Sequence, residues 1–111
     1  MNPLCSLADL DAGTPMVVRR PPQRSIILMA VDDGLVAFRN ACPHAGFELG
    51  FSGAALHCED DQLLKCSVHG ALFRRDTGVC VSGPCEGARL KPIELVISGS
   101  MVFAPNQSAS A

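Results

Sequence analysis

Short apolar runs separated by turn-forming residues recur along the chain, and this pattern predicts β-strands rather than helices. The strongest pair is RSIILMAV at 24–31 and LVAFRN at 35–40, which flank a DDG turn signal at 32–34 and so predict a hairpin. Near the end of the chain, 88–98 and 101–104 are separated by a Gly-Ser pair and predict a second hairpin. The pattern therefore favours an all-β fold class.

The region between the two hairpins, about 41–87, is rich in Gly, Pro and Cys and contains only short strand signals. These signals are LLKCS at 63–67, ALFRR at 71–75 and VCVSG at 79–83. A short strand is also expected at 15–20, and one short helical turn within 6–13. No linker divides the chain, so we expect a single domain over 1–104, followed by a disordered polar tail at 105–111.

Composition narrows the class of protein. The chain has 111 residues, a net charge of -2 and a pI near 5.8, so nothing indicates a nucleic-acid partner. The longest apolar run, 26–31, is far shorter than the roughly 20 residues of a membrane span, and the N-terminus does not resemble a secretion signal. We therefore expect a cytoplasmic protein, in which six cysteines indicate metal or redox chemistry before a disulfide framework.

Two fragments of this middle region combine a thiol with an imidazole. Cys42 and His44 form a C-x-H pair, and after 21 intervening residues Cys66 and His69 form a C-x-x-H pair. Four such ligands from two loops suit either zinc or a two-iron, two-sulfide cluster with two Cys on one iron and two His on the other. A glycine follows each histidine closely, and glycines let backbone amides approach a cluster. This partly favours the iron–sulfur cluster over zinc.

The fragments CPHAG at 42–46 and CSVHGALFRRDTGVCVSGP at 66–84 together resemble the Rieske iron–sulfur family. The resemblance covers nearly the whole chain and implies a Rieske-like fold: antiparallel sheets of a small β-sandwich with an inserted, loop-rich cluster-binding subdomain at about 41–87. It implies one [2Fe-2S] cluster per chain, with Cys42 and Cys66 on the inner iron and His44 and His69 on the outer iron. The gap between the two motifs is longer than in small family members, and the extra length is assigned to 50–62.

The resemblance also bears on the reduction potential. High-potential family members join the two ligand loops by a disulfide, at positions that are Phe47 and Val68 here, and place hydroxyl groups on the cluster sulfurs, at positions that are Ala71 and Phe73 here. Hydrogen bonds to sulfur stabilise the reduced, more negative cluster, so their loss lowers the potential. We therefore expect a value near the low end of the Rieske range, nearer roughly -150 mV than +300 mV.

These features predict a soluble, monomeric electron carrier that passes single electrons from a flavin reductase to a terminal oxygenase, as in aromatic-ring dioxygenase systems. Contacts with both partners are expected near His44 and His69. The chain is not expected to be an enzyme, because His57 is the only other histidine and no Gly-rich dinucleotide motif is present. Two alternatives stay open: a small Rieske subunit of an assimilatory nitrite reductase, and a zinc-stabilised structural module.

Several other residues have competing interpretations. Cys5 and Cys58 are expected to be ordinary thiols. Cys80 and Cys85 flank the Gly83-Pro84 loop that should cover the cluster, and reduced thiols are favoured there over a disulfide. His57 is expected to be a surface residue and not a ligand. The remaining residues are assigned either to ordinary structure or to a docking face for a partner: Glu59, Asp60, Asp61, Arg19, Arg20, Arg24, Phe47, Leu49, Phe51 and Leu72.

Overall fold

The computed structural model describes residues 3–10, 14–19, 25–31, 34–43, 48–50, 52, 56, 62–66, 70–83 and 85–105. Within these ranges it contains strands and one short 3-10 turn, and no helix there is long and apolar enough to cross a membrane. In chain order the elements are β1 (Cys5–Ser6), η1 (Leu7–Asp9), β2 (Met16–Val18), β3 (Ile26–Val31), β4 (Gly34–Arg39), β5 (Leu63–Lys65), β6 (Leu72–Arg74), β7 (Cys80–Ser82), β8 (Val96–Ser98) and β9 (Met101–Phe103).

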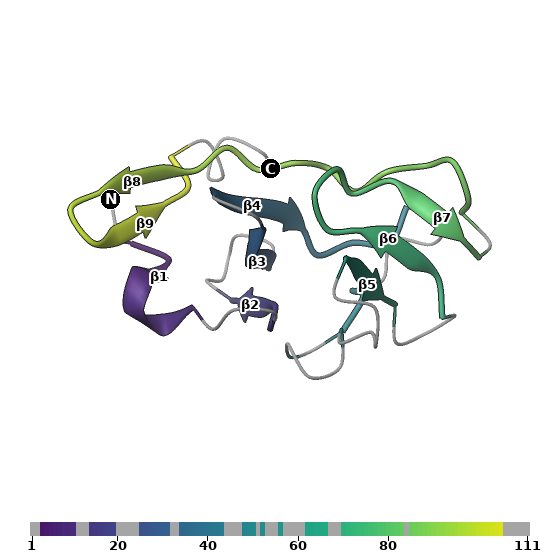
Figure 1. Ribbon diagram of the computed structural model, residues 1–111, viewed down its shortest axis with the longest axis horizontal. Helices are drawn as coiled ribbons and strands as arrows, with labels where there is room; N and C mark the ends of the chain where they lie inside the picture. The colour runs from purple at the N-terminus through teal and green to yellow at the C-terminus, as the bar shows by residue number, and fades with distance from the viewer. Residues whose placement is uncertain are drawn as a thin grey trace.

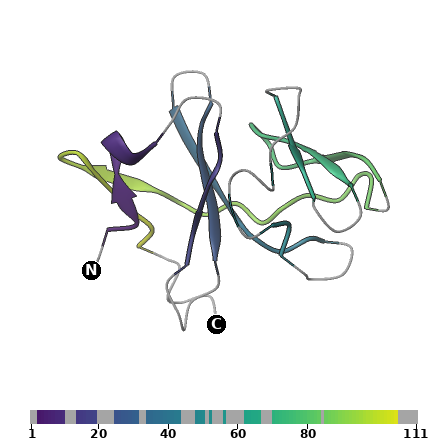
Figure 2. The same cartoon turned by 90° about the horizontal axis from the view of Figure 1, so that it is seen from below.

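The strands form three antiparallel sheets of three strands each among these residues. We call β1-β9-β8 the terminal sheet, β2-β3-β4 the middle sheet and β5-β6-β7 the site sheet. The middle sheet lies between the other two, which occupy opposite ends of the molecule (Figures 1 and 2). The all-β fold class expected from the sequence is therefore confirmed for the described residues.

The middle sheet has apolar residues on both faces, which explains the unbroken apolar run of β3. Ile27 and Met29 pack into one hydrophobic cluster, whereas the alternate residues Ile26 and Leu28 pack into the other. Successive side chains of a strand point to opposite faces, so a strand buried on both faces reads as continuously apolar. We call the two clusters the site-side core and the terminal-side core.

The site-side core lies between the middle sheet and the site sheet. The residues of this core that lie outside the middle sheet include Leu64 of β5, Phe73 of β6 and Leu90, and all three are fully buried. The cysteines at 42 and 66 belong to the same cluster. The terminal-side core joins the opposite face of the middle sheet to Leu4 and Val102. The two candidate cysteine ligands are thus anchored in the core that the middle sheet shares with the site sheet.

The hairpin expected from 24–31 and 35–40 is confirmed, because β3 and β4 pair in register from Ile26↔Arg39 to Val31↔Gly34. The short strands expected at 15–20, 63–67, 71–75 and 79–83 are present as β2, β5, β6 and β7. The helical turn expected within 6–13 is the single turn η1, where the Ser6 amide donates to Asp9 Oδ2 at 3.0 Å. The paired strand β1 just before it was not predicted.

The second hairpin is shorter than the sequence predicted, because β8 is the only part of 88–98 that pairs with β9. The preceding segment, 88–95, crosses the molecule from the site sheet to the middle sheet. Its amides at Leu90 and Ile93 donate to Gly78 O and Ala37 O at 2.9 and 2.8 Å. Pro92, which lacks an amide hydrogen, stands in an isolated bridge opposite Phe38. The apolar pattern of this segment therefore reflects packing against two sheets. The boundaries of a single domain at 1–104 and a tail at 105–111 stay predictions.

Candidate metal centre

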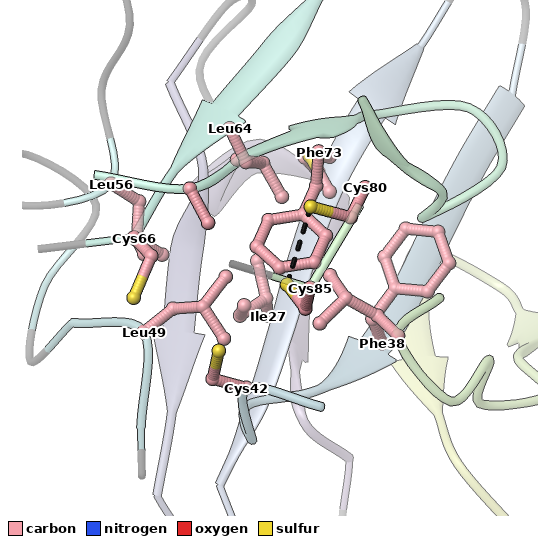
Figure 3. Close-up of a cluster of buried hydrophobic side chains, with 13 residues drawn as sticks. Ile27, Phe38, Cys42, Leu49, Leu56, Leu64, Cys66, Phe73, Cys80 and Cys85 are labelled. Atoms are coloured by element: carbon pink, nitrogen blue, oxygen red, sulfur yellow. Dashed lines mark hydrogen bonds between the residues drawn. The ribbon is translucent and has the colours of Figure 1, made fainter. Parts of the chain in front are cut away.

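The two candidate ligand cysteines each follow a strand that fixes its position. Cys42 lies three residues after β4 and Cys66 lies directly after β5. Both are free thiols, with 3% and 1% of their surfaces exposed. In Figure 3 the two side chains lie along one margin of the site-side core, with Leu49 between them. The structure thus places a buried thiol at the start of each of the two loops that the sequence singled out.

The candidate histidine ligands, His44 and His69, lie outside the described residues. The same holds for the following residues with sequence-based expectations: Arg20, Arg24, Phe47, Phe51, His57, Cys58, Glu59, Asp60, Asp61, Val68 and Pro84. In the part of the chain that is described, no three His, Cys, Asp or Glu side chains are grouped as a metal site. The four-residue ligand set therefore stays a prediction.

The second ligand loop is closed by hydrogen bonds between its ends. The Cys66 amide donates to Ala71 O at 2.8 Å, and the Gly70 amide donates to Cys66 O at 2.9 Å. Gly70 has a φ of 71°, a left-handed conformation in which glycine carries no Cβ penalty. The backbone thus turns back within a few residues and presents the Cys66 thiol from a rigid strand end.

The first ligand loop is closed by a side chain, that of Asn40. The Leu49 amide donates to Asn40 Oδ1 at 2.8 Å, and Asn40 Nδ2 donates to Gly50 O at 3.0 Å. The Asn40 amide itself donates to Ser25 O at 3.0 Å, and the residue is 4% exposed. One buried amide group therefore joins the two ends of the loop that begins at Cys42 and fixes both to the middle sheet.

Glu48 provides a second attachment of the same loop. Both guanidinium nitrogens of Arg19 donate to the Glu48 carboxylate, one of them at 2.8 Å, and Ser25 Oγ donates to it at 2.5 Å. The Arg19 hydrogen bond lowers the pKa of Glu48, against an opposing effect of burial and with help from Ser25. Arg19 therefore holds the first ligand loop against the middle sheet. Of the two roles that the sequence left open for Arg19, the structure supports the structural one.

The loop after β7 packs directly on the second ligand loop. Gly83 has a φ of 111°, and a Cβ built there would lie 2.8 Å from the Cα of Ala71. This approach is possible only for glycine. Gly78 has a φ of 78°, and a Cβ built there would lie 2.8 Å from Cε1 of the Phe38 ring. The two glycines bring the site sheet close to the ligand loop and to the middle sheet.

Two further thiols lie in the site-side core beside the ligand cysteines. The Cys85 thiol donates to the Cys80 sulfur at 3.2 Å, next to the Phe73 ring (Figure 3). Burial raises the pKa of Cys85 to about 12, with further contributions from Cys80 and then Cys42. Both are free thiols, as the sequence favoured. Cys42 and Cys66 belong to the same buried cluster, so this pair adjoins the candidate metal centre.

The residues predicted to tune the potential are partly described. Ala71 and Phe73 are fully buried in the site-side core and carry no hydroxyl group. Leu49 is fully buried and belongs to the same core, so it is a core residue and not part of a docking face. Leu72 is half-buried.

The donor chemistry of the described part fits an iron–sulfur group. Two buried thiols at the starts of two tightly closed loops can act as thiolate ligands, and thiolates suit zinc and iron–sulfur clusters alike. The sequence model of the Rieske [2Fe-2S] domain matches residues 1–98. The chain belongs to the Rieske [2Fe-2S] domain family. This membership supports a Rieske cluster over the zinc site that the ligand spacing alone left open.

Solved structures agree with the family assignment. A ferredoxin of Sphingomonas yanoikuyae B1 has a TM-score of 0.72 at 24% identity, over 93% of this chain and 95% of its own. A chain from the complex of reduced oxygenase and oxidised ferredoxin in carbazole 1,9a-dioxygenase has a TM-score of 0.71 at 25% identity, over 92% and 98%. No curated relative matches the sequence.

The same fold also occurs inside a larger protein. The terminal oxygenase of carbazole 1,9a-dioxygenase from Novosphingobium sp. KA1 has a TM-score of 0.74 at 22% identity, and this Rieske protein spans 28% of its length. The ferredoxins, in contrast, match over nearly their whole length.

The sequence did not identify Asn40 or Glu48 as residues that hold a ligand loop. Asn40 follows the charged Arg39 at the end of a strand signal, so nothing in the local pattern marked it as a buried clamp. Nothing in the sequence pairs Glu48 with Arg19, which lies 29 positions away in the chain.

Proposed function

We propose that this Rieske protein is an electron carrier that passes single electrons to a terminal oxygenase. The observation that carries the proposal is the pair of buried thiols, Cys42 and Cys66, at the starts of two loops of a Rieske fold that spans 98 residues. The likeness to a chain from an oxygenase–ferredoxin complex supports an oxygenase as the acceptor. The electron donor in the proposal is a flavin reductase, and the protein acts in the cytoplasm as a monomer.

The proposed ligands are the two described cysteines and two histidines, His44 and His69, with one cluster per chain. When bound, the cluster supplies a site that accepts and releases one electron. The chain's own part is to hold the thiols: Asn40 closes the first loop, and the hydrogen bonds of Cys66 with Ala71 and with Gly70 close the second. The imidazoles are proposed to face the partner proteins.

The surroundings of the thiols support a potential at the low end of the family range. Ala71 and Phe73 are fully buried beside the ligand loop and offer no hydroxyl donor to a cluster sulfur. A weakly hydrogen-bonded cluster is easier to oxidise, which suits a carrier that must reduce an oxygenase. Phe73→Tyr adds a phenolic hydroxyl and is expected to raise the midpoint potential, whereas a value equal to that of the parent would contradict this account.

Freshly purified protein gives a direct test. We expect two irons and two acid-labile sulfides per chain, visible absorption, and after reduction the EPR signal of a cluster with mixed Cys and His ligands. His69→Cys should lower the potential sharply or abolish the cluster, and Cys5→Ala, which changes a thiol in the terminal sheet, should leave both unchanged. A colourless protein with one zinc per chain would overturn the proposal.

The acceptor is tested separately from the cluster. The chemically reduced protein is mixed with the oxidised oxygenase of an aromatic-ring dioxygenase system, and the cluster absorption is followed over time. We expect reoxidation that speeds up with oxygenase concentration. If the rate is the same with and without oxygenase, the cluster assignment would stand but the acceptor assignment would be wrong.

A further inference from the structure

The most unusual feature outside the proposed ligands is the thiol pair of Cys80 and Cys85. Cys80 begins β7, and Cys85 lies in the turn that follows, with 1% and 8% of their surfaces exposed. Their sulfur atoms are 3.2 Å apart, and a hydrogen bond joins them (Figure 3). None of the proposed ligand positions uses either thiol.

The backbone of the intervening loop holds the two side chains together. The Cys80 amide donates to Ala88 O at 2.8 Å, and the Gly87 amide donates to Cys80 O at 3.0 Å. The loop is therefore closed at its base, and within it the Glu86 amide donates to Gly83 O at 3.2 Å. A disulfide needs a sulfur separation of about 2.05 Å, so the two atoms must approach by only about 1 Å, which side-chain rotation can supply.

We propose that Cys80 and Cys85 form a second reactive site, a dithiol that a two-electron oxidant converts into an intramolecular disulfide. With hydrogen peroxide, one thiol becomes a sulfenic acid as the O–O bond breaks and one water leaves. The second thiol then displaces the sulfenic oxygen as a second water, and the S–S bond forms. A dithiol reductant reverses the change by returning two electrons and two protons.

Access to the pair comes from the surface position of its loop. Val81 is 43% exposed, and its neighbours Ser82, Gly83, Glu86 and Gly87 are exposed as well. Local opening of this loop would bring both thiols to solvent. In the closed loop both sulfur atoms are buried, so oxidation requires this opening.

The disulfide would act on the candidate metal centre through the loop that carries Cys85. Gly83 of this loop packs on Ala71, directly after the second ligand loop, and Cys85 belongs to the same buried cluster as Cys42. A covalent link from Cys85 to β7 would hold the loop in this position. We therefore expect the oxidised form to lose its cluster more slowly, a consequence that rests on the proposed function.

The bond itself can be tested by mass spectrometry without reference to the cluster. Trypsin cleaves after Arg75 and Arg89, so one peptide, 76–89, contains both cysteines. The holoprotein is treated with increasing concentrations of hydrogen peroxide and then denatured in the presence of N-ethylmaleimide, which labels the remaining free thiols. The protein is digested with trypsin, and the masses of the peptides are measured. We expect this peptide to lose two hydrogens and take no maleimide, while Cys5 stays labelled. In Cys85→Ser the same peptide should take one maleimide.

Two outcomes would overturn the site. The first is a peptide that still takes two maleimides at peroxide concentrations that already modify Cys5. The second is a disulfide that joins Cys85 to Cys42 instead of to Cys80. Neither depends on the presence of iron, so this test stays informative even if the proposed function fails.

The consequence for the cluster is tested by iron loss to a chelator, followed by visible absorption. The oxidised holoprotein is expected to lose iron about threefold more slowly than the reduced one, because the opening of the loop is restricted. Cys85→Ser should show no difference between the two treatments. Equal rates for the two forms of the parent protein would show that the disulfide does not protect the centre.

Discussion

The middle sheet and the site sheet are held together by different means. In the middle sheet, β3 and β4 pair over six residues each without irregularity, and their alternate residues enter two cores. In the site sheet the strands have three residues each, and the pairing of β6 with β7 shifts register between Leu72 and Phe73. The first sheet is specified by its apolar pattern, whereas the second depends on glycines, loop clamps and thiols at single positions.

Loss of a metal ligand should produce the largest difference in stability between the site sheet and the middle sheet. In Cys42→Ser we expect no cluster, and because metal binding and local folding are coupled, amide exchange in β5, β6 and β7 should accelerate by a large factor, equivalent to several kcal/mol. Exchange in β3 and β4 should change little. Hydrogen exchange with mass spectrometry measures both, and Cys5→Ser is the control. Equal acceleration in all strands would show that the two regions unfold as one unit.

Substitution of a glycine that packs on the second ligand loop should have the next largest effect on stability. Gly83→Ala must adopt a φ of 111° and also places a Cβ 2.8 Å from backbone, so we expect a loss of about 4 kcal/mol of folding free energy. Gly87→Ala is the matched control, because its φ of 92° is equally strained but nothing lies within 4 Å. It should cost about 1–2 kcal/mol. Denaturant unfolding measures both, and equal losses would mean that the contact with Ala71 is unimportant.

The difference between the two regions also explains what the sequence could predict. The hairpin of β3 and β4 was visible because hydrophobic runs and a turn signal act over neighbouring residues. The Cys/His motifs were visible because their spacing is specific. The clamp by Asn40, and the pairing of Arg19 with Glu48, join positions far apart in the chain, and no local pattern encodes such pairs. The segment 88–95 resembled a strand because it packs against two sheets.

The Asn40 clamp links the two regions, so its removal tests whether the middle sheet positions the ligand loop. Asn40→Ala leaves the buried Leu49 amide and Gly50 carbonyl without these partners, which should cost about 3 kcal/mol. It should also change the EPR line shape and midpoint potential of the cluster, which a purely structural loss elsewhere would not. Asn40→Asp keeps the acceptor for Leu49 and should be intermediate. Unchanged spectra in both variants would show that the loop holds its shape without Asn40.

The smallest expected effect on stability is that of the ion pair between Arg19 and Glu48 at the same loop. Because Arg19 lowers the pKa of Glu48, the pair stabilises the folded state above the ordinary carboxylate pKa of 4.5, and this contribution is lost as the pH falls through the lowered value. Both side chains are partly exposed, so the contribution should be below about 1 kcal/mol and weaker in high salt.

The test of this pair is the difference in unfolding free energy between the parent and Glu48→Gln across pH. We expect a constant difference from pH 8 to about pH 5 that disappears in more acidic solution, where the parent carboxylate is also neutral. Acid loss of the cluster affects both proteins and cancels in the difference. If the difference persisted in acid, Glu48 would stabilise the loop through its shape and its hydrogen bond with Ser25, and the charge of Arg19 would be incidental.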